Sequence, residues 1–136
     1  MKVMFVCTGN SARSQMAEGW ARYLSGDKWE VHSAGVQPRG VNPYAIKTMQ
    51  EIGIDISQQK SKNLDYELMG QMDVIVTLCD NAKESCPVTP PKIKTFHWSL
   101  PDPAGFTGTD EQKKQFFRTV RDEIRERIKK LLPGLS

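Results

Sequence analysis

The amino-acid sequence predicts one α/β domain with a four-stranded parallel sheet flanked by helices. Two apolar runs, at residues 2–7 and 73–79, are continuous rather than alternating, which is typical of strands buried on both faces of a parallel sheet. Segments with helical periodicity alternate with the strand patterns, as crossovers between parallel strands require. A chain of 136 residues is long enough for one core but not for two, so residues 1–136 are expected to form a single domain.

The first half of the chain supplies two strands and two helices. Residues 14–25 are predicted to be helical and residues 29–34 to form a second, shorter strand. Asn42 and Pro43 have the arrangement of a helix cap followed by a first-turn proline, and Gly53 ends that helix. In the first helix the apolar face is expected to hold Met16, Trp20, Tyr23 and Leu24, and Gly26 is expected to stop it.

The second half supplies the remaining elements. A short helix is expected within 61–70, and the apolar run at 73–79 is followed by a proline-rich connector at 87–91. Residues 94–98 form the last strand pattern, and residues 100–109 form a loop rich in proline and glycine. A helix over 110–132 closes the chain, with an apolar stripe of Phe117, Val120, Ile124, Ile128 and Leu131.

Composition narrows the range of functions. No apolar run reaches the roughly 20 residues of a membrane span, and the first residues lack the layout of a signal peptide, so a cytoplasmic protein without membrane contact is expected. The net charge of +3 comes from residues 110–132, where eight basic and five acidic residues alternate in sign. That pattern favours a solvated helix face over a nucleic-acid surface. Nothing in the chain requires more than a monomer, and no cofactor or metal is expected.

The residues after the first strand have the character of an anion-binding loop. They are small or polar and are predicted to bind an oxyanion: Thr8, Gly9, Asn10, Ser11, Ala12, Arg13 and Ser14. With Gly9 free to adopt positive φ, successive N–H groups can point inward as a nest, and Arg13 adds a planar fork suited to paired oxygens. A helix that begins near Arg13 contributes further positive potential at the same place.

Cys7, at the end of the first strand, is the predicted nucleophile. The positive potential of the loop favours its thiolate, and Ser14 is placed to donate a hydrogen bond to the sulfur. The alternative is a buried structural cysteine and an arginine in a surface ion pair. The order of strand, small-residue loop and helix favours the nucleophile.

Two further groups are expected at the same edge of the sheet, because ligands of such folds bind at the carboxyl ends of the strands. Cys79 ends the strong strand pattern at 73–79, and Cys86 follows seven residues later. On an intact helix two such cysteines are about 10 Å apart, so a disulfide between them requires residues 80–86 to unwind. Asp102, between two prolines, is the candidate general acid, although such an aspartate is also common in turns.

Other interpretations of the cysteines stay open at this point. Cys79 and Cys86 are compatible with a core residue and an idle surface thiol. A zinc site built from Cys79, Cys86 and His97 is a further alternative, which the long spacing between the cysteines disfavours.

The sequence C-T-G-N-S-A-R-S after an N-terminal strand, with D-P late in the chain, resembles the low-molecular-weight protein tyrosine phosphatase family over essentially the whole length. Within that fold the segments V-T-L-C, C-P and H-W, which contain Cys79, Cys86 and His97, look like those of the thioredoxin-coupled arsenate reductases.

The resemblance implies an oxidoreductase of arsenic detoxification that converts arsenate to arsenite. Cys7 attacks arsenate held by the loop and Arg13, and Asp102 protonates the departing oxygen. Cys79 attacks the Cys7 adduct, arsenite leaves, and Cys86 then takes over the disulfide, which thioredoxin reduces.

The resemblance also implies a supporting shell and leaves two alternatives. Asn10 is expected to hold the loop in shape, with Glu18 and Ser33 behind it, whereas the monovalent cation that some members bind is disfavoured here by Lys60 and Lys62. A tyrosine phosphatase is the main alternative, although Ala104 stands after D-P where that family places an aromatic residue. A non-enzymatic cysteine redox switch is the other.

Overall fold

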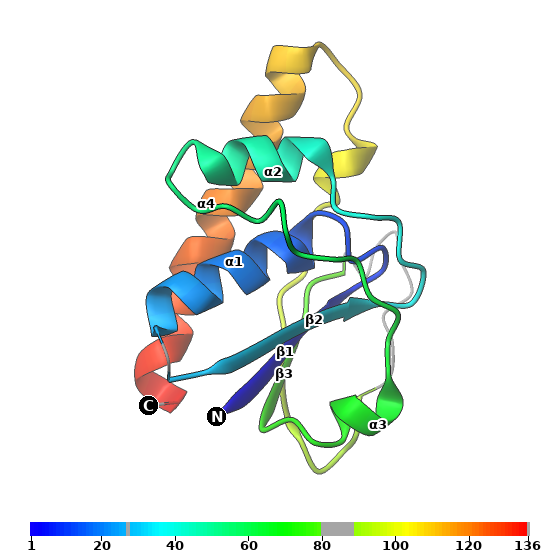
Figure 1. The fold of residues 1–136 in the computed structure, drawn as a ribbon, viewed down its shortest axis with the longest axis vertical. Helices are drawn as coiled ribbons and strands as arrows, with labels where there is room; N and C mark the ends of the chain where they lie inside the picture. Colours follow the sequence, from blue (N-terminus) through cyan, green and yellow to red (C-terminus); the bar gives the residue numbers. More distant parts are fainter. Residues whose placement is uncertain (27, 80–88, 136) are drawn as a thin grey trace.

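The structure is a computed structural model that describes residues 1–26, 28–79 and 89–135. Figure 1 shows helices packed against the strands of its sheet. The elements are β1 (Lys2–Cys7), α1 (Arg13–Ser25), β2 (Glu30–Gly35), α2 (Pro43–Gln50), α3 (Tyr66–Met69), β3 (Val74–Thr77), β4 (Lys94–His97), a short 3-10 helix (Pro103–Gly105) and α4 (Asp110–Leu135).

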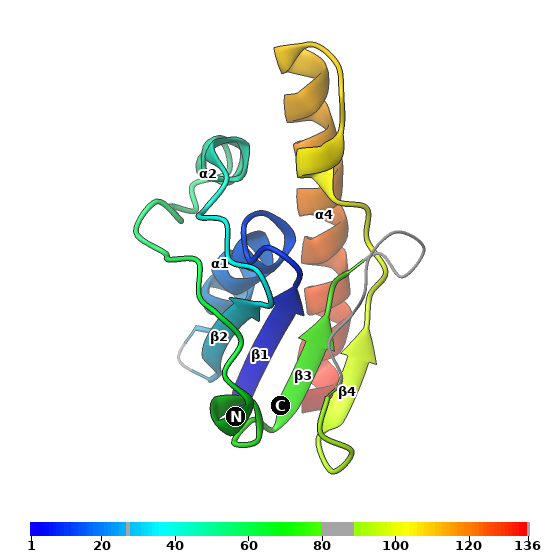
Figure 2. The ribbon, with the colours of Figure 1, turned by 90° about the vertical axis from the view of Figure 1, so that its right-hand side faces the viewer.

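The sheet has four parallel strands in the order β2-β1-β3-β4, which confirms the predicted architecture. All four arrows point the same way in Figure 2, so their carboxyl ends form one edge of the sheet. Val6 lies opposite Thr77 in the register of β1 with β3, and Cys7 lies opposite Gly35 in the register of β1 with β2. The first residues beyond β1 and β3 therefore meet at this edge.

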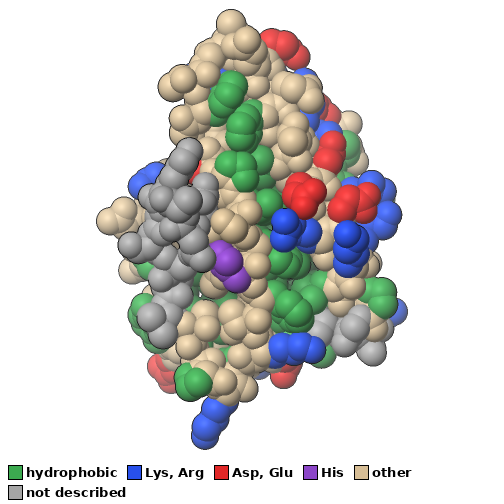
Figure 3. All heavy atoms as spheres, turned by 180° about the vertical axis from the view of Figure 1, so that it is seen from behind, with side chains coloured by type: hydrophobic (Ala, Val, Ile, Leu, Met, Phe, Trp, Pro, Cys, Tyr) green, Lys and Arg blue, Asp and Glu red, His purple; other side chains and the backbone are tan. Residues whose placement is uncertain are grey.

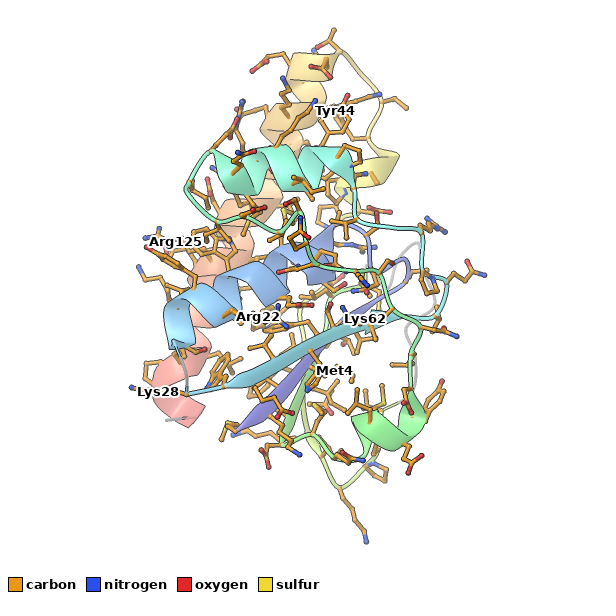
Figure 4. The ribbon with its side chains drawn as sticks, viewed as in Figure 1. Met4, Arg22, Lys28, Tyr44, Lys62 and Arg125 are labelled. Carbon is orange, nitrogen blue, oxygen red and sulfur yellow. The ribbon has the colours of Figure 1, made fainter. Side chains whose placement is uncertain are left out.

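Both faces of β1 are buried, as its continuous apolar run predicts. Val3, Phe5 and Cys7 belong to the larger core, which α1 and α4 share with the sheet. Met4 and Val6 belong to a smaller core on the other face, closed by residues of and around α3. Figure 4 shows Met4 on the side of α3. Because neighbouring residues of a strand point to opposite faces, this single strand contributes to both cores.

α4 covers the larger core along most of the molecule. All five residues of the predicted stripe are buried. The helix continues to Leu135, three residues past its predicted end, within the range over which helix ends vary. Acidic and basic side chains lie next to each other on the face seen in Figure 3, and ion pairs such as Arg127–Glu123 join them.

Of the predicted apolar face of α1, Leu24 is half-buried and Tyr23 is exposed. Tyr23 is 67% exposed, although Met16 and Trp20 are buried as predicted. The indole N–H of Trp20 donates to the carbonyl of Arg121, so α4 packs directly over Trp20. Tyr23 lies about 60° further around α1, outside this contact, and only the edge of its ring approaches Trp20.

Local signals place most of the remaining boundaries. Asn42 accepts a hydrogen bond from the Tyr44 N–H with Pro43 in the first turn, as predicted. Gly26, in a positive-φ conformation, ends α1. β3 and α3 are each shorter than the segments expected for them, 73–79 and 61–70. Within the described part of the chain, no helix is long and apolar enough to cross a membrane.

Candidate active site

The loop from Cys7 to Ser14 joins β1 to α1 at the carboxyl edge of the sheet. Its left-handed residue is Asn10, with φ 44°, and not Gly9 as the sequence suggested. Asparagine tolerates this conformation because its side chain forms local hydrogen bonds. Gly9 lies under the side chain of Arg39: a Cβ atom there would lie 3.3 Å from Cδ of Arg39, which would have to shift by a few tenths of an ångström.

A chain of hydrogen bonds leads to the sulfur of Cys7. Lys62 N donates to Oδ1 of Asn10 at 2.7 Å, which leaves the amide nitrogen of Asn10 facing Oγ of Ser14, also at 2.7 Å. Because that amide nitrogen can only donate, Ser14 keeps its own proton for Sγ of Cys7, 2.9 Å away. The arrangement directs the hydroxyl of Ser14 at the sulfur of Cys7, which is buried and is a free cysteine.

Arg13 and Asp102 reach the same point from distant parts of the chain. Arg13 is almost fully buried, and its Nη1 donates to the carbonyls of Leu78 and Leu100, beyond β3 and β4. Its Nη2 lies 3.8 Å from Oδ2 of Asp102. The other oxygen of Asp102 caps the 3-10 helix by accepting from the Ala104 N–H. Arg13 is thus held by two chain segments, the one after β3 and the one after β4, and one oxygen of Asp102 faces it.

These residues surround a cavity of about 30 Å³. The cavity is lined by Cys7, Gly9, Ser11, Ala12, Arg13, Arg39, Asp102 and Ala104. Backbone hydrogen bonds support the loop, since the carbonyls of Thr8 and Ser11 accept from the backbone N–H groups of Gln37 and Asn42. The cavity is small, and the side chains around it include a thiol, a guanidinium and a carboxyl group.

A buried carboxylate lies behind the loop. Glu18, 2% exposed, accepts hydrogen bonds from Ser33 at 2.5 Å and pairs with Arg22 at 2.6 Å. The ammonium of Lys62 lies 3.5 Å from the same carboxylate. Lys62 therefore places a positive charge in the stretch where the sequence analysis disfavours a bound monovalent cation. Figure 4 shows Arg22 and Lys62 along the space between α1 and β2. No group of residues suited to a metal ion is found among the described residues.

Gly35 is a site residue that the sequence analysis missed. It ends β2 opposite Cys7, and a Cβ atom on it would lie 2.7 Å from both Asn10 N and Thr8 O. Only glycine lets the loop pack this closely against β2. The sequence signal was a Ser-Ala-Gly run at the end of a strand, and it does not show what approaches the glycine.

Cys79 lies where the register predicts. It is two residues beyond Thr77, the partner of Val6, and is fully buried at the edge that Cys7 occupies on the next strand. It takes part in a disulfide. Cys86, the unwinding of residues 80–86 and the connector up to residue 88 lie outside the described residues. His97, the other member of the zinc alternative, lies 2.6 Å from Oγ1 of Thr77 through Nδ1.

Comparison with known proteins agrees with this geometry. Residues 2–136 match the family model described as low molecular weight phosphotyrosine protein phosphatase. An arsenate reductase of Bacillus subtilis is 53% identical over 127 residues, which cover 93% of this chain and 91% of that protein. A solved structure described as an arsenate reductase in the phosphate binding state has a TM-score of 0.82 and 40% identity, and covers 99% of this chain and 98% of that one.

A thioredoxin-dependent arsenate reductase of Corynebacterium glutamicum is more distant. Its structure has a TM-score of 0.77 and 25% identity, and the match covers 98% of this chain but 60% of that one. The identity and coverage of the Bacillus relative, together with the family model, settle the classification. The chain belongs to the low molecular weight phosphotyrosine protein phosphatase family and, within it, to the arsenate reductases.

Proposed function

We propose that this protein reduces arsenate to arsenite with electrons from thioredoxin, and that it acts as a cytoplasmic monomer in arsenic detoxification. The observation that carries the proposal is the placement of two buried cysteines at the carboxyl ends of adjacent strands. Cys7 is the last residue of β1, and Cys79 lies two residues beyond Thr77 of β3, the partner of Val6. Adjacent strands are about 4.8 Å apart, and Cys79 lies at the same edge of the sheet as Cys7, which supports transfer of a disulfide between the two residues.

The first step is attack of the Cys7 thiolate on the arsenic of arsenate. A sulfur–arsenic bond forms, one arsenic–oxygen bond breaks, and the departing oxygen takes a proton from Asp102 to leave as water. Ser14 stabilises the thiolate before attack through its contact with Sγ at 2.9 Å. The loop N–H groups and Arg13 bind the remaining oxygens, whose charge is matched by the positive end of α1.

The second step reduces the arsenic. Once thioredoxin has reduced the disulfide in which Cys79 takes part, the thiolate of Cys79 attacks the sulfur of Cys7. The electron pair of the sulfur–arsenic bond goes to arsenic, which leaves as arsenite. Two electrons have then moved from the two sulfurs to arsenic, and a Cys7–Cys79 disulfide remains. Cys86 attacks Cys79, which frees Cys7, and reduced thioredoxin then attacks the Cys79–Cys86 disulfide.

The tyrosine phosphatase alternative has less support from the site. Phosphatase and reductase share the first step, so weak hydrolysis of small phosphate esters is expected. However, Ala104 lines the cavity at the position after Asp102-Pro103, so its small side chain supplies no ring to stack on a phosphotyrosine. The homologous reductases likewise favour the inorganic substrate over a redox switch without turnover.

Arsenate-dependent oxidation of NADPH, coupled through thioredoxin and thioredoxin reductase, tests the proposal. The wild type should turn over many times, and Cys7→Ser should show neither reduction nor phosphatase activity. Cys79→Ser should form no arsenite, because the adduct cannot be resolved, whereas Cys86→Ser should stop after about one turnover per chain.

Two outcomes would contradict the mechanism. Sustained turnover by Cys86→Ser would exclude the relay through that residue, and reduction by Cys7→Ser would place the nucleophile elsewhere. The reductant is tested by replacing thioredoxin with glutaredoxin and glutathione. Equal rates with both would exclude the assignment to thioredoxin.

A further inference from the structure

Arg39 lies beside the oxyanion loop, and its backbone is fixed against it. After β2 the chain turns back along the loop, where Gln37 N donates to Thr8 O at 2.9 Å and Arg39 N donates to Gly9 O at 3.0 Å. Two backbone hydrogen bonds therefore hold the segment in register with the loop, and the side chain of Arg39 begins from a defined position.

The side chain of Arg39 extends over Gly9 and into the wall of the cavity. Its Cδ and Nε would lie 3.3 Å and 3.7 Å from a Cβ atom on Gly9, and the residue lines the cavity together with Cys7 and Asp102. Cys7 is buried at the inner end of the cavity. Arg39 is exposed to solvent and therefore lies at the outer side of the cavity.

The charge of Arg39 is available to a ligand, in contrast to that of Arg13. Arg13 already donates to Leu78 and Leu100 and faces Asp102. Among the residues that the structure describes, no carboxylate forms an ion pair with Arg39, although the other arginines of the described helices each have one. An arginine left without an acid at an anion pocket, with a fork of donors that fits paired oxygens, is suited to bind the anion itself.

We propose that Arg39 is a second oxyanion-binding residue that selects free inorganic oxyanions over phosphate esters. This inference rests on the proposed function. The buried oxygens of a bound arsenate face the loop and Arg13, and the outward oxygens accept hydrogen bonds from Arg39. In an ester the organic group occupies that outward position, so the ester both loses the charged contact and competes with the arginine for space.

Arg39→Gln tests the inference, because it removes the charge and keeps much of the side-chain length. KM for arsenate should rise about tenfold with little change in kcat, since a charge-assisted contact present both before and during the reaction is lost. The inhibition constant of inorganic phosphate should rise by a similar factor. Hydrolysis of p-nitrophenyl phosphate should fall less or increase, so the preference for arsenate over the ester drops about tenfold.

Two further variants separate this role from general effects of charge or folding. Arg125→Gln removes the same charge from α4, on a side of the molecule away from the loop segment that holds Lys62 (Figure 4), and should leave both activities unchanged. Arg39→Lys should recover part of the arsenate affinity, and added salt should weaken the wild type more than Arg39→Gln.

The outcomes distinguish this inference from the proposed function. If the wild type reduces arsenate and Arg39→Gln has unchanged constants for arsenate and phosphate, Arg39 does not bind the oxyanion. If the wild type fails to reduce arsenate but calorimetry shows that phosphate binding weakens in Arg39→Gln, the reductase assignment fails and the binding role of Arg39 stands. An equal loss for arsenate and for p-nitrophenyl phosphate would contradict the selectivity.

Discussion

Asn10 determines which hydrogen bond the sulfur of Cys7 receives. It is fully buried in a left-handed conformation, and its amide both accepts from Lys62 N and donates to Ser14 Oγ. The acceptor contact fixes which end of the amide faces Ser14, and Ser14 must then direct its proton to Cys7. A side chain two steps from the sulfur thus sets the direction of the hydrogen bond that the sulfur receives.

Ser14→Ala should lower the reactivity of Cys7 about tenfold at neutral pH, because a hydrogen bond to a charged group contributes about 1.5 kcal/mol or more. The measurement is the rate of alkylation by iodoacetamide in a Cys79→Ser, Cys86→Ser background, where Cys7 is the only thiol. Ser25→Ala is the matched control, since Ser25 is also buried but lies at the other end of α1. Equal rates for Ser14→Ala and Ser25→Ala would contradict a role of Ser14 at the sulfur.

At the scale of elements, the sequence predicts what depends on local pattern. β1 is buried on both faces as its continuous apolar run requires, and α2 begins at Asn42 because a cap and a first-turn proline specify a helix start. Contacts between distant segments are not encoded locally. Tyr23 has the spacing of a buried residue but lies outside the reach of α4, and Gly35 is required by the loop that packs on it.

For the candidate site, too, the sequence predicts the residues that local pattern places and misses those that contacts between distant segments place. The chemical types of Cys7, Arg13 and Asp102 and their places after strands were sufficient to bring them to one cavity. Arg39 gave no such signal, because an arginine in a loop is ordinary until the structure shows that it covers Gly9. The left-handed residue was misassigned to Gly9 because glycine has the greater freedom, whereas the hydrogen bonds that favour Asn10 come from residue 62.

Gly35→Ala should disturb the loop through the end of β2. The new Cβ would lie 2.7 Å from two backbone atoms, so the loop must shift. Overpacking of this kind costs about 1–3 kcal/mol of unfolding free energy, and phosphate affinity should fall as well because the loop N–H groups move. Urea unfolding and calorimetric titration with phosphate measure the two effects.

Gly70→Ala is the control for Gly35→Ala. The nearest atom to a Cβ on Gly70, outside its chain neighbours, lies 3.4 Å away, which is ordinary contact, and its φ of −65° suits alanine. This variant should bind phosphate like the wild type. If Gly35→Ala also retains wild-type affinity, the close approach of β2 does not define the loop.

At the scale of the whole molecule, one cluster of charged side chains joins α2 to α4. Glu51, at the end of α2, pairs with Arg118 at 2.8 Å and Arg121 at 3.1 Å, both on α4. Arg121 is buried and also donates to the carbonyl of Thr48. We propose that the chain is one domain that unfolds as a unit, since α4 contacts α1, α2 and the 3-10 helix.

Glu51→Gln tests whether the chain unfolds as one unit and how the stability that this cluster contributes depends on pH. Hydrogen bonds from Arg118, and then from Arg121, hold the pKa of Glu51 below its usual value of 4.5. Because the pKa of Glu51 is lower in the folded chain than in the unfolded chain, its carboxylate stabilises the fold above pH 4.5. This contribution is lost as the pH falls through the lowered pKa of the folded chain. At pH 7 the variant should lose about 1 kcal/mol of unfolding free energy, because water screens a partly exposed pair, and the difference from the wild type should shrink in acid.

In a single domain, tryptophan fluorescence and far-ultraviolet circular dichroism must report the same urea midpoint as each other, in the wild type and in the variant. Glu67→Gln, at a residue for which the described part of the chain shows no ion pair, should change neither. Separate midpoints for the two probes would contradict a single domain, and a difference that does not shrink as the pH falls below 4.5 would contradict the role of the Glu51 charge.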